Sequence, residues 1–205
     1  NAFIYFNIIE RRAVSQIKSP FGGVGLFSEV DEDLISDFLL FIINQLKNLG
    51  LTQILINQYP DNYQEFNLEN ILIKRGFKKI QTDINQHINL GAPTFYSMLN
   101  SDKKYCLNKC NKENFDSRHL SYNEIPKAFE IVNDNLSRKN FPLTLSLKQI
   151  QKAFIDYPNN YYAFGTYDGE ELIAAIMSVS INNNILYNFY HGYKKEYSKY
   201  SPLVS

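Results

Sequence analysis

Three short segments near the C-terminal end constrain the fold of this chain more than any other feature. Residues 161–168, 171–181 and 185–193 are each rich in β-branched, aromatic or aliphatic residues, as strands are. Asp168–Gly169 separates the first two segments, and 182–184, which are all Asn, separate the last two. Asp, Asn and Gly tolerate the positive φ that hairpin turns require. The pattern therefore predicts an antiparallel meander of three strands.

Two helices are predicted immediately before this meander. Ser121 and Glu124 have the spacing of a capping box, and Ser146 and Gln149 repeat it. Apolar residues follow each box at helical spacing. They are Ala128, Phe129, Val132 and Leu136 in the first helix, and Leu147, Ile150 and Phe154 in the second. With a short strand expected at 114–120, the order of this half becomes strand, helix, helix and three strands.

The first half of the chain predicts a second set of alternating elements. In order, we expect a hairpin at 2–17, a glycine-rich loop at 19–27, a helix from Asp31 or Asp33 to Gly50, a buried strand at 51–60, a helix at 66–75 and a half-buried strand at 77–90. A polar, lysine-rich stretch at 93–113 predicts a connecting helix. The chain thus predicts two α/β units, 1–92 and 114–205, joined by that helix.

Composition narrows the classes of function. The 205 residues hold 21 basic and 21 acidic side chains, so no overall field favours DNA or an anionic membrane. No apolar run reaches the roughly 18 residues of a spanning helix, which predicts the absence of an integral membrane segment. Two cysteines and three scattered histidines make no metal ligand set. We expect a reduced, cytoplasmic protein without a metal cofactor.

The polar end of the third meander strand is the first candidate site. A tyrosine hydroxyl can act as a general acid and a histidine as a general base, so Tyr187, Tyr190 and His191 are candidate catalytic residues. The alternative for the tyrosines is core packing with a hydrated hydroxyl, and for His191 an ordinary surface position. Strand alternation places 187 and 189 on one face and 188 and 190 on the other.

The glycine-rich loop is the second candidate site. Gly22 and Gly23, followed by Gly25, precede a capped helix and allow an anion to approach the backbone closely. A tight strand-to-helix turn explains the same glycines. Two further polar segments each allow a functional and a structural interpretation. The polar face of 77–90 contacts either a substrate or water. The lysines of 194–199 contact a phosphorylated donor, RNA or solvent.

The order of elements resembles the GNAT acyltransferase fold, and two units in one chain resemble its FemABX-type branch. The resemblance is carried by SPFGG (19–23), QYPDNY (58–63), TDINQHINL (82–90), PLTLS (142–146), the 168–180 hairpin and YNFYHGYKKEYSKYSP (187–202). It implies transfer of an acyl or aminoacyl group from a thioester or aminoacyl donor to an amine of a bacterial cell-envelope or sugar precursor. The implied donor- or substrate-binding residues are Ser19, Phe21, Gly22, Gly23, Asn188, Tyr193 and Ser201.

One segment departs from the family pattern. The stretch 193–202 has no glycine after Gly192, so the pyrophosphate motif of acyl-CoA enzymes is not evident. This absence makes acyl-CoA a possible donor without a visible phosphate site, and it leaves aminoacyl-tRNA as another possible donor. A homodimer is also possible. Both units are expected to be incomplete, the first at its start and the second after the loop. The alternative function is a non-catalytic small-molecule-binding protein with a degenerate GNAT fold.

Overall fold

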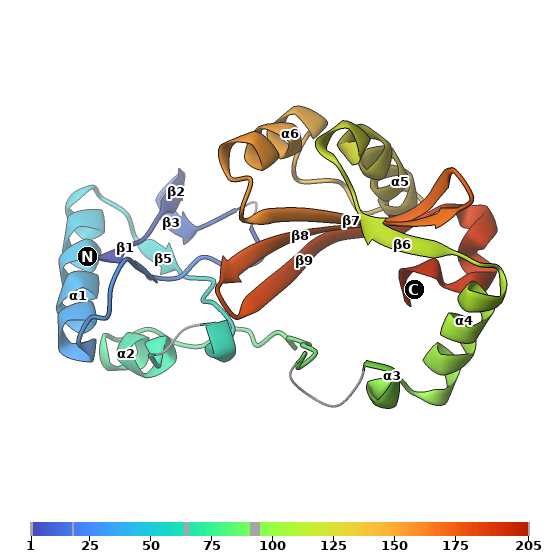
Figure 1. Ribbon diagram of the computed structural model, residues 1–205. Helices are drawn as coiled ribbons and strands as arrows, with labels where there is room; N and C mark the ends of the chain where they lie inside the picture. The colour runs from blue at the N-terminus through green and yellow to red at the C-terminus, as the bar shows by residue number, and fades with distance from the viewer. Residues whose placement is uncertain (1, 18, 64–65, 91–94, 205) are drawn as a thin grey trace. The chain divides into compact units, whose positions relative to one another are not determined.

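The computed structural model describes residues 2–17, 19–63, 66–90 and 95–204. They form a mixed α/β fold, as predicted, in two compact units, Asn1–His87 and Ile88–Ser205 (Figure 1). The predicted boundary at 92–93 lies outside the described residues. The tandem arrangement of two GNAT-like units stays a prediction.

The first unit combines two small sheets with two helices. Its elements are β1 (Ala2–Phe3), β2 (Phe6–Ile9), β3 (Arg12–Ser15), β4 (Gly25–Leu26), α1 (Glu32–Asn48), β5 (Gln53–Leu55) and α2 (Leu68–Lys74). Strands β2 and β3 form the predicted hairpin, and β5 pairs with β3 in parallel. Strands β1 and β4 form a separate antiparallel pair. Leu39 and Ile35 of α1 pack with Leu68 and Ile71 of α2 in the core.

Two strand predictions in the first unit were wrong. The expected buried strand at 51–60 is only the three residues of β5, and Gln53 and Leu55 are exposed. The segment 77–90 forms no strand, and its alternating apolar side chains are exposed, Ile84 by 90%. Period-two alternation describes a face that a sheet would bury, but a strand also needs a hydrogen-bonded neighbour. Within the described residues this segment has none.

The second unit confirms the predicted order around one four-stranded sheet. Its elements are α3 (Phe95–Met98), α4 (Ser101–Lys112), β6 (Asp116–His119), α5 (Ile125–Ser137), α6 (Leu147–Asp156), β7 (Tyr161–Asp168), β8 (Glu171–Asn182) and β9 (Ile185–Tyr193). All neighbouring strands are antiparallel, in the order β6-β7-β8-β9. The expected connecting helix is two helices, α3 and α4. Two 3₁₀ segments, Lys195–Tyr200 and Pro202–Val204, follow β9.

Helices α5 and α6 cover one face of this sheet (Figure 1). Ile131 of α5 and Ile150 of α6 pack against Ala163, Ala175 and Met177 of the strands. Each fully buried aliphatic side chain contributes about 1.5–3 kcal/mol, whereas a helix cap contributes about 1 kcal/mol. The capping boxes therefore define where the helices begin, and the shared core holds them on the sheet.

No helix in the described part of the chain is both long and apolar enough to cross a bilayer.

Candidate functional site

A bulge in β9 determines where the predicted catalytic side chains point. Met177 of β8 pairs with Tyr190, and the next residue, Ser178, pairs with Asn188. Phe189 is therefore an extra residue in β9, and its ring packs with that of Tyr190 against the helix-covered core. The predicted alternation, with 188 and 190 on one face, was wrong, because a bulge resets the period-two pattern. Bulges of this kind occur often at sheet edges and beside active sites.

Asn188 and His191 lie on the other face of the sheet. Asn188 Oδ1 accepts a 2.6 Å hydrogen bond from Ser178 Oγ. His191 pairs with Ile176, whose neighbours Ala175 and Met177 both point into the helix-side core. Because strand residues alternate, Ile176 and His191 point away from the helices. The bulge thus places His191 on the same face as Asn188, which is the face that α5 and α6 leave uncovered.

One row of side chains crosses all four strands on this face. Directly opposed residues share a face, and His119, Phe164, Ile176 and His191 are paired in that order from β6 to β9. The rings of His119 and Phe164 meet edge-on, with 5.4 Å between their centroids. Both histidines are exposed, and no strand of the described chain pairs with the outer edge of β9. The row therefore ends in an exposed imidazole at a free sheet edge.

The surroundings of His191 favour its neutral form. Partial loss of hydration lowers its pKa, and the nearby positive charge of Lys139 lowers it further. A neutral imidazole can accept a proton at pH 7.

Tyr190 has a different environment from His191. Its hydroxyl oxygen accepts hydrogen bonds from the backbone N–H groups of Thr144 and Leu145, at 3.0 and 3.1 Å. Thr144 Oγ1 lies 2.8 Å from the same oxygen. Tyr190 therefore holds the loop that leads into α6. Tyr187 is half-buried on the same strand.

Gly192 and Tyr193 connect β9 to α5. A side chain at 192 would place its Cβ 2.8 Å from the backbone Cα of Val132, so only glycine allows this close approach. The Tyr193 carbonyl accepts a 2.8 Å hydrogen bond from the Arg138 guanidinium, and Lys139 lies over the Tyr193 ring. Tyr193, a predicted binding residue, thus has structural contacts to the end of α5.

The segment after β9, expected to contact the donor, is held by side chains of its own unit. The Tyr197 hydroxyl donates to Asp168 and lies 3.2 Å from Glu171. The Thr166 hydroxyl donates to the carbonyl of the buried Pro202. Ser201 lies between these contacts with a φ of 53°. These contacts fix the course of the segment along the sheet.

The predicted binding residues of the glycine-rich loop lie in the first unit, unlike the others. The Ser19 hydroxyl donates to the Phe21 carbonyl at 2.8 Å, and the Gly22 N–H donates to the Asn57 carbonyl at 2.6 Å. A Cβ on Gly22 would lie 2.1 Å from Gln16 Cγ. A Cβ on Gly23 would lie 3.1 Å from the side chain of Leu68. These contacts are those of close packing against neighbouring side chains, and neither glycine has the positive φ that a tight turn requires.

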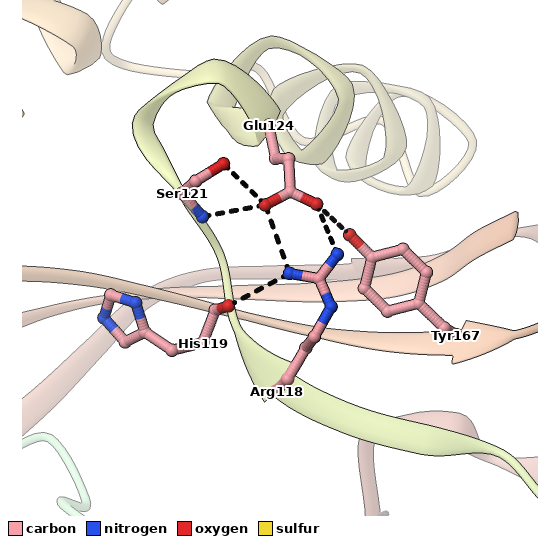
Figure 2. A network of polar contacts seen from close by, with 5 residues as sticks. All are labelled: Arg118, His119, Ser121, Glu124 and Tyr167. Carbon is pink, nitrogen blue, oxygen red and sulfur yellow. Dashed lines mark hydrogen bonds and ion pairs between the residues drawn. The ribbon is translucent and has the colours of Figure 1, made fainter. Parts of the chain in front are cut away.

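A polar network that the sequence did not reveal joins β6, β7 and the start of α5 (Figure 2). The Arg118 guanidinium binds both oxygens of Glu124, at 2.6 and 3.2 Å, and lies 4.3 Å from the centre of the Tyr167 ring. The Tyr167 hydroxyl donates to Glu124 at 2.5 Å, and Ser121 donates through both its backbone N–H and its hydroxyl. An open cleft of about 300 Å³ lies over this network. Its lining is Asp116, Arg118, Glu124, Lys127, Tyr167, Gly169 and Glu170.

The electrostatics of this network fix its protonation. Arg118 holds the pKa of Glu124 well below its usual range, and Tyr167 and Ser121 add to the effect. Burial, followed by the bond to Glu124, raises the pKa of Tyr167 to about 12. Neither group titrates near pH 7, so the network does not suit acid–base catalysis there. It serves as a structural link between three elements.

The sequence identified only part of this network. The capping box located Ser121 and Glu124, whereas Arg118 and Tyr167 had no predicted role. The sequence feature that could have predicted the network is strand alternation, which places the side chains of Arg118 and Tyr167 on the face covered by α5. A charged side chain on such a face requires a partner, and the capping carboxylate is the acid that begins α5.

Comparisons with known proteins found a partial structural similarity for this chain. No protein-family model matches it, and no curated protein sequence matches it. Among solved structures, an aminoglycoside acetyltransferase from an uncultured soil metagenomic sample, in complex with sisomicin, is similar to part of it. The two are 15% identical with a TM-score of 0.34, and the match covers 44% of this chain. This chain spans 62% of that protein.

The described residues contain no group of three or more His, Cys, Asp or Glu side chains placed to hold a metal ion.

Proposed function

We propose that the second unit is the core of an N-acyltransferase. The carrying observation is a bulged strand at a free sheet edge, β9, at the end of the order strand, helix, helix and three strands. The donor is a thioester or an aminoacyl ester, and the acceptor is an amine of a cell-envelope or sugar precursor. The acceptor class rests on the resemblance of the sequence to the FemABX-type branch.

Edge geometry supports the transfer step. An edge strand presents backbone N–H groups that can bind the carbonyl oxygen of an acyl group and stabilise the charge that develops on it. The amine nitrogen attacks the carbonyl carbon, and the thiolate or alkoxide leaves. His191 accepts the proton that the amine loses. Binding both substrates along β9 supplies the remaining catalysis through proximity.

The segment after β9 bears on the choice of donor. It has no glycine beyond Gly192, and Tyr197 and Pro202 attach it to the sheet. A donor recognised mainly at its acyl group fits this segment better than one that needs a backbone cradle for pyrophosphate. Acyl-CoA and aminoacyl-tRNA both carry such acyl groups, so both belong in the assay.

A ligand-binding protein that has lost transfer is the second candidate. The observation that favours it is the engagement of the Tyr190 hydroxyl with Thr144 and Leu145 on the helix-covered side, which leaves Tyr190 unavailable as an acid beside His191. This protein would bind the donor and form no product.

A transfer assay separates the two functions. The purified chain is incubated with acetyl-CoA, or with an aminoacyl-tRNA, and a panel of amino sugars and diamines, and the products are measured by mass spectrometry. We expect acylated amine from the wild type and a 10²–10⁴-fold lower rate for His191→Ala, the usual contribution of a general base. His119→Ala is the matched control, because His119 is the exposed histidine at the other end of the same row. Donor binding without product favours the binding protein, and equal rates for both variants exclude His191 as the base.

A further inference from the structure

Helices α3 and α4 expose an unusual number of large side chains. Phe95, Tyr96 and Met98 of α3 are 44%, 47% and 40% exposed, and Tyr105 of α4 is 65% exposed. The opposite side of α4 is buried through Cys110, which contacts the Tyr200 carbonyl. These aromatic and apolar groups are therefore open to solvent.

Lysines surround these rings. Lys104 lies 5.2 Å from the centre of the Tyr96 ring, and Lys109 lies 5.5 Å from that of Tyr105. Lys199, from the segment after β9, lies 4.8 Å from the ring of Tyr200, which Lys109 also approaches. Tyr105, Lys109 and Lys112 are spaced at i, i+4 and i+7, which is one face of a helix. We call Tyr96, Lys104, Tyr105, Lys109, Lys112 and Lys199 the lysine–tyrosine surface.

The charge of this surface has no acidic partner among the described residues, and the Lys109 ammonium donates a 2.9 Å hydrogen bond to the uncharged Lys199 carbonyl. Helix α4 carries four lysines and one acidic residue, Asp102. Among the described residues, none of the lysines of the lysine–tyrosine surface forms an ion pair. The Glu113 carboxylate, at the end of α4, accepts a hydrogen bond from the Tyr200 hydroxyl, at 3.3 Å. A partner with negative charge would therefore complement the surface without displacing an internal ion pair.

We propose that the lysine–tyrosine surface, with Phe95 and Met98, binds an anionic lipid bilayer from one side. Lysine clusters on a helix attract anionic headgroups, tyrosines sit at headgroup level, and exposed apolar side chains enter the acyl boundary. The binding is peripheral and adds a location to the proposed transfer activity without depending on it.

Two features favour a bilayer over RNA. Phe95 and Met98 offer apolar surface beside the charge, and a methionine provides no flat ring on which a base can stack. The cations of α3 and α4 are all lysines, whereas arginine is the residue that suits bidentate recognition of nucleic acid phosphates.

Co-sedimentation of the full chain with vesicles tests this proposal. We expect binding to vesicles of 30% phosphatidylserine in phosphatidylcholine, weaker binding at higher salt, and no binding to pure phosphatidylcholine. Lys104→Gln/Lys112→Gln should lower the partition coefficient about 30-fold, since each lysine near the surface is worth roughly fivefold. Lys78→Gln/Lys148→Gln makes the same change of charge at exposed positions elsewhere and should bind like the wild type.

A second pair of variants tests the apolar contribution. Phe95→Ser/Met98→Ser should bind anionic vesicles at least tenfold more weakly, whereas Leu34→Ser/Phe41→Ser, at exposed positions of α1, should not. Circular dichroism confirms that each variant is folded. Equal vesicle binding by both lysine variants overturns the proposal. So does binding of a labelled single-stranded RNA that depends on Lys104 and Lys112 while vesicles are not bound.

Discussion

Gly192 shows how a single residue controls the position of the candidate site. The absence of a side chain lets α5 lie against the end of β9, where a Cβ would come within 2.8 Å of the Val132 backbone. Because the obstacle is backbone, a larger residue has to move the helix or the strand. The position of His191, one residue earlier, depends on the same packing.

Substitution Gly192→Ala should therefore destabilise the second unit. Forcing a methyl group into a packed interface costs about 1–3 kcal/mol. Urea denaturation measures this loss as a lower unfolding midpoint with an unchanged slope. Leu186→Ala, at an exposed position of the same strand, should cost less than about 0.5 kcal/mol. A Gly192→Ala protein as stable as the wild type would show that α5 and β9 are not in close contact.

At the scale of elements, Glu124 is the main link between β6, β7 and α5. One carboxylate accepts bonds from Arg118 on β6, from Tyr167 on β7 and from Ser121 at the start of the helical segment. The side chain of Glu124 is 23% exposed, so solvent weakens its ion pair only in part. This arrangement fixes α5 on the sheet at the end opposite to Gly192 along the helix.

The link should weaken in acid. The pKa of Glu124 is lower in the folded state than its unfolded value of about 4.3, so the native state binds fewer protons there. The resulting stabilisation is present above that pH and is lost as the pH falls towards the folded pKa. At pH 7, Glu124→Gln should lower the free energy of unfolding by roughly 1–2 kcal/mol.

Chemical denaturation of wild type and variant at pH 7 and pH 3 measures this effect. The difference in stability between them should shrink at pH 3. Glu130→Gln, an exposed position on the same helix, should match the wild type at both values. A Glu124→Gln defect of equal size at pH 3 and pH 7 would show that the charge of the carboxylate is not what stabilises the link.

At the scale of the whole molecule, local patterns predicted much of the fold. Turn residues, capping boxes and helical spacing located the meander and α1, α5 and α6, because each pattern acts within a few residues. Predictions that depend on pairing with a strand elsewhere in the chain were less accurate. The segment 77–90 has strand alternation but no described neighbour, and the bulge at Phe189 depends on how β9 meets β8.

The candidate site was predicted in the same uneven way. The polar ending of β9 pointed to His191 and Asn188, which share the uncovered face. The network of Glu124 was missed, because Arg118 and Tyr167 come together with it only through the pairing of β6 with β7.

The central claim is that the free edge of β9 binds an acyl donor. A titration of the ¹⁵N-labelled chain with acetyl-CoA, followed by amide chemical shifts, tests it most directly, with acetyl-N-acetylcysteamine as a thioester that lacks phosphates. We predict that both ligands shift the amides of residues 187–193 and that the Glu124 cleft responds to neither. Shifts confined to the Glu124 cleft or to α4, or no shifts with either thioester at millimolar concentration, would contradict the account.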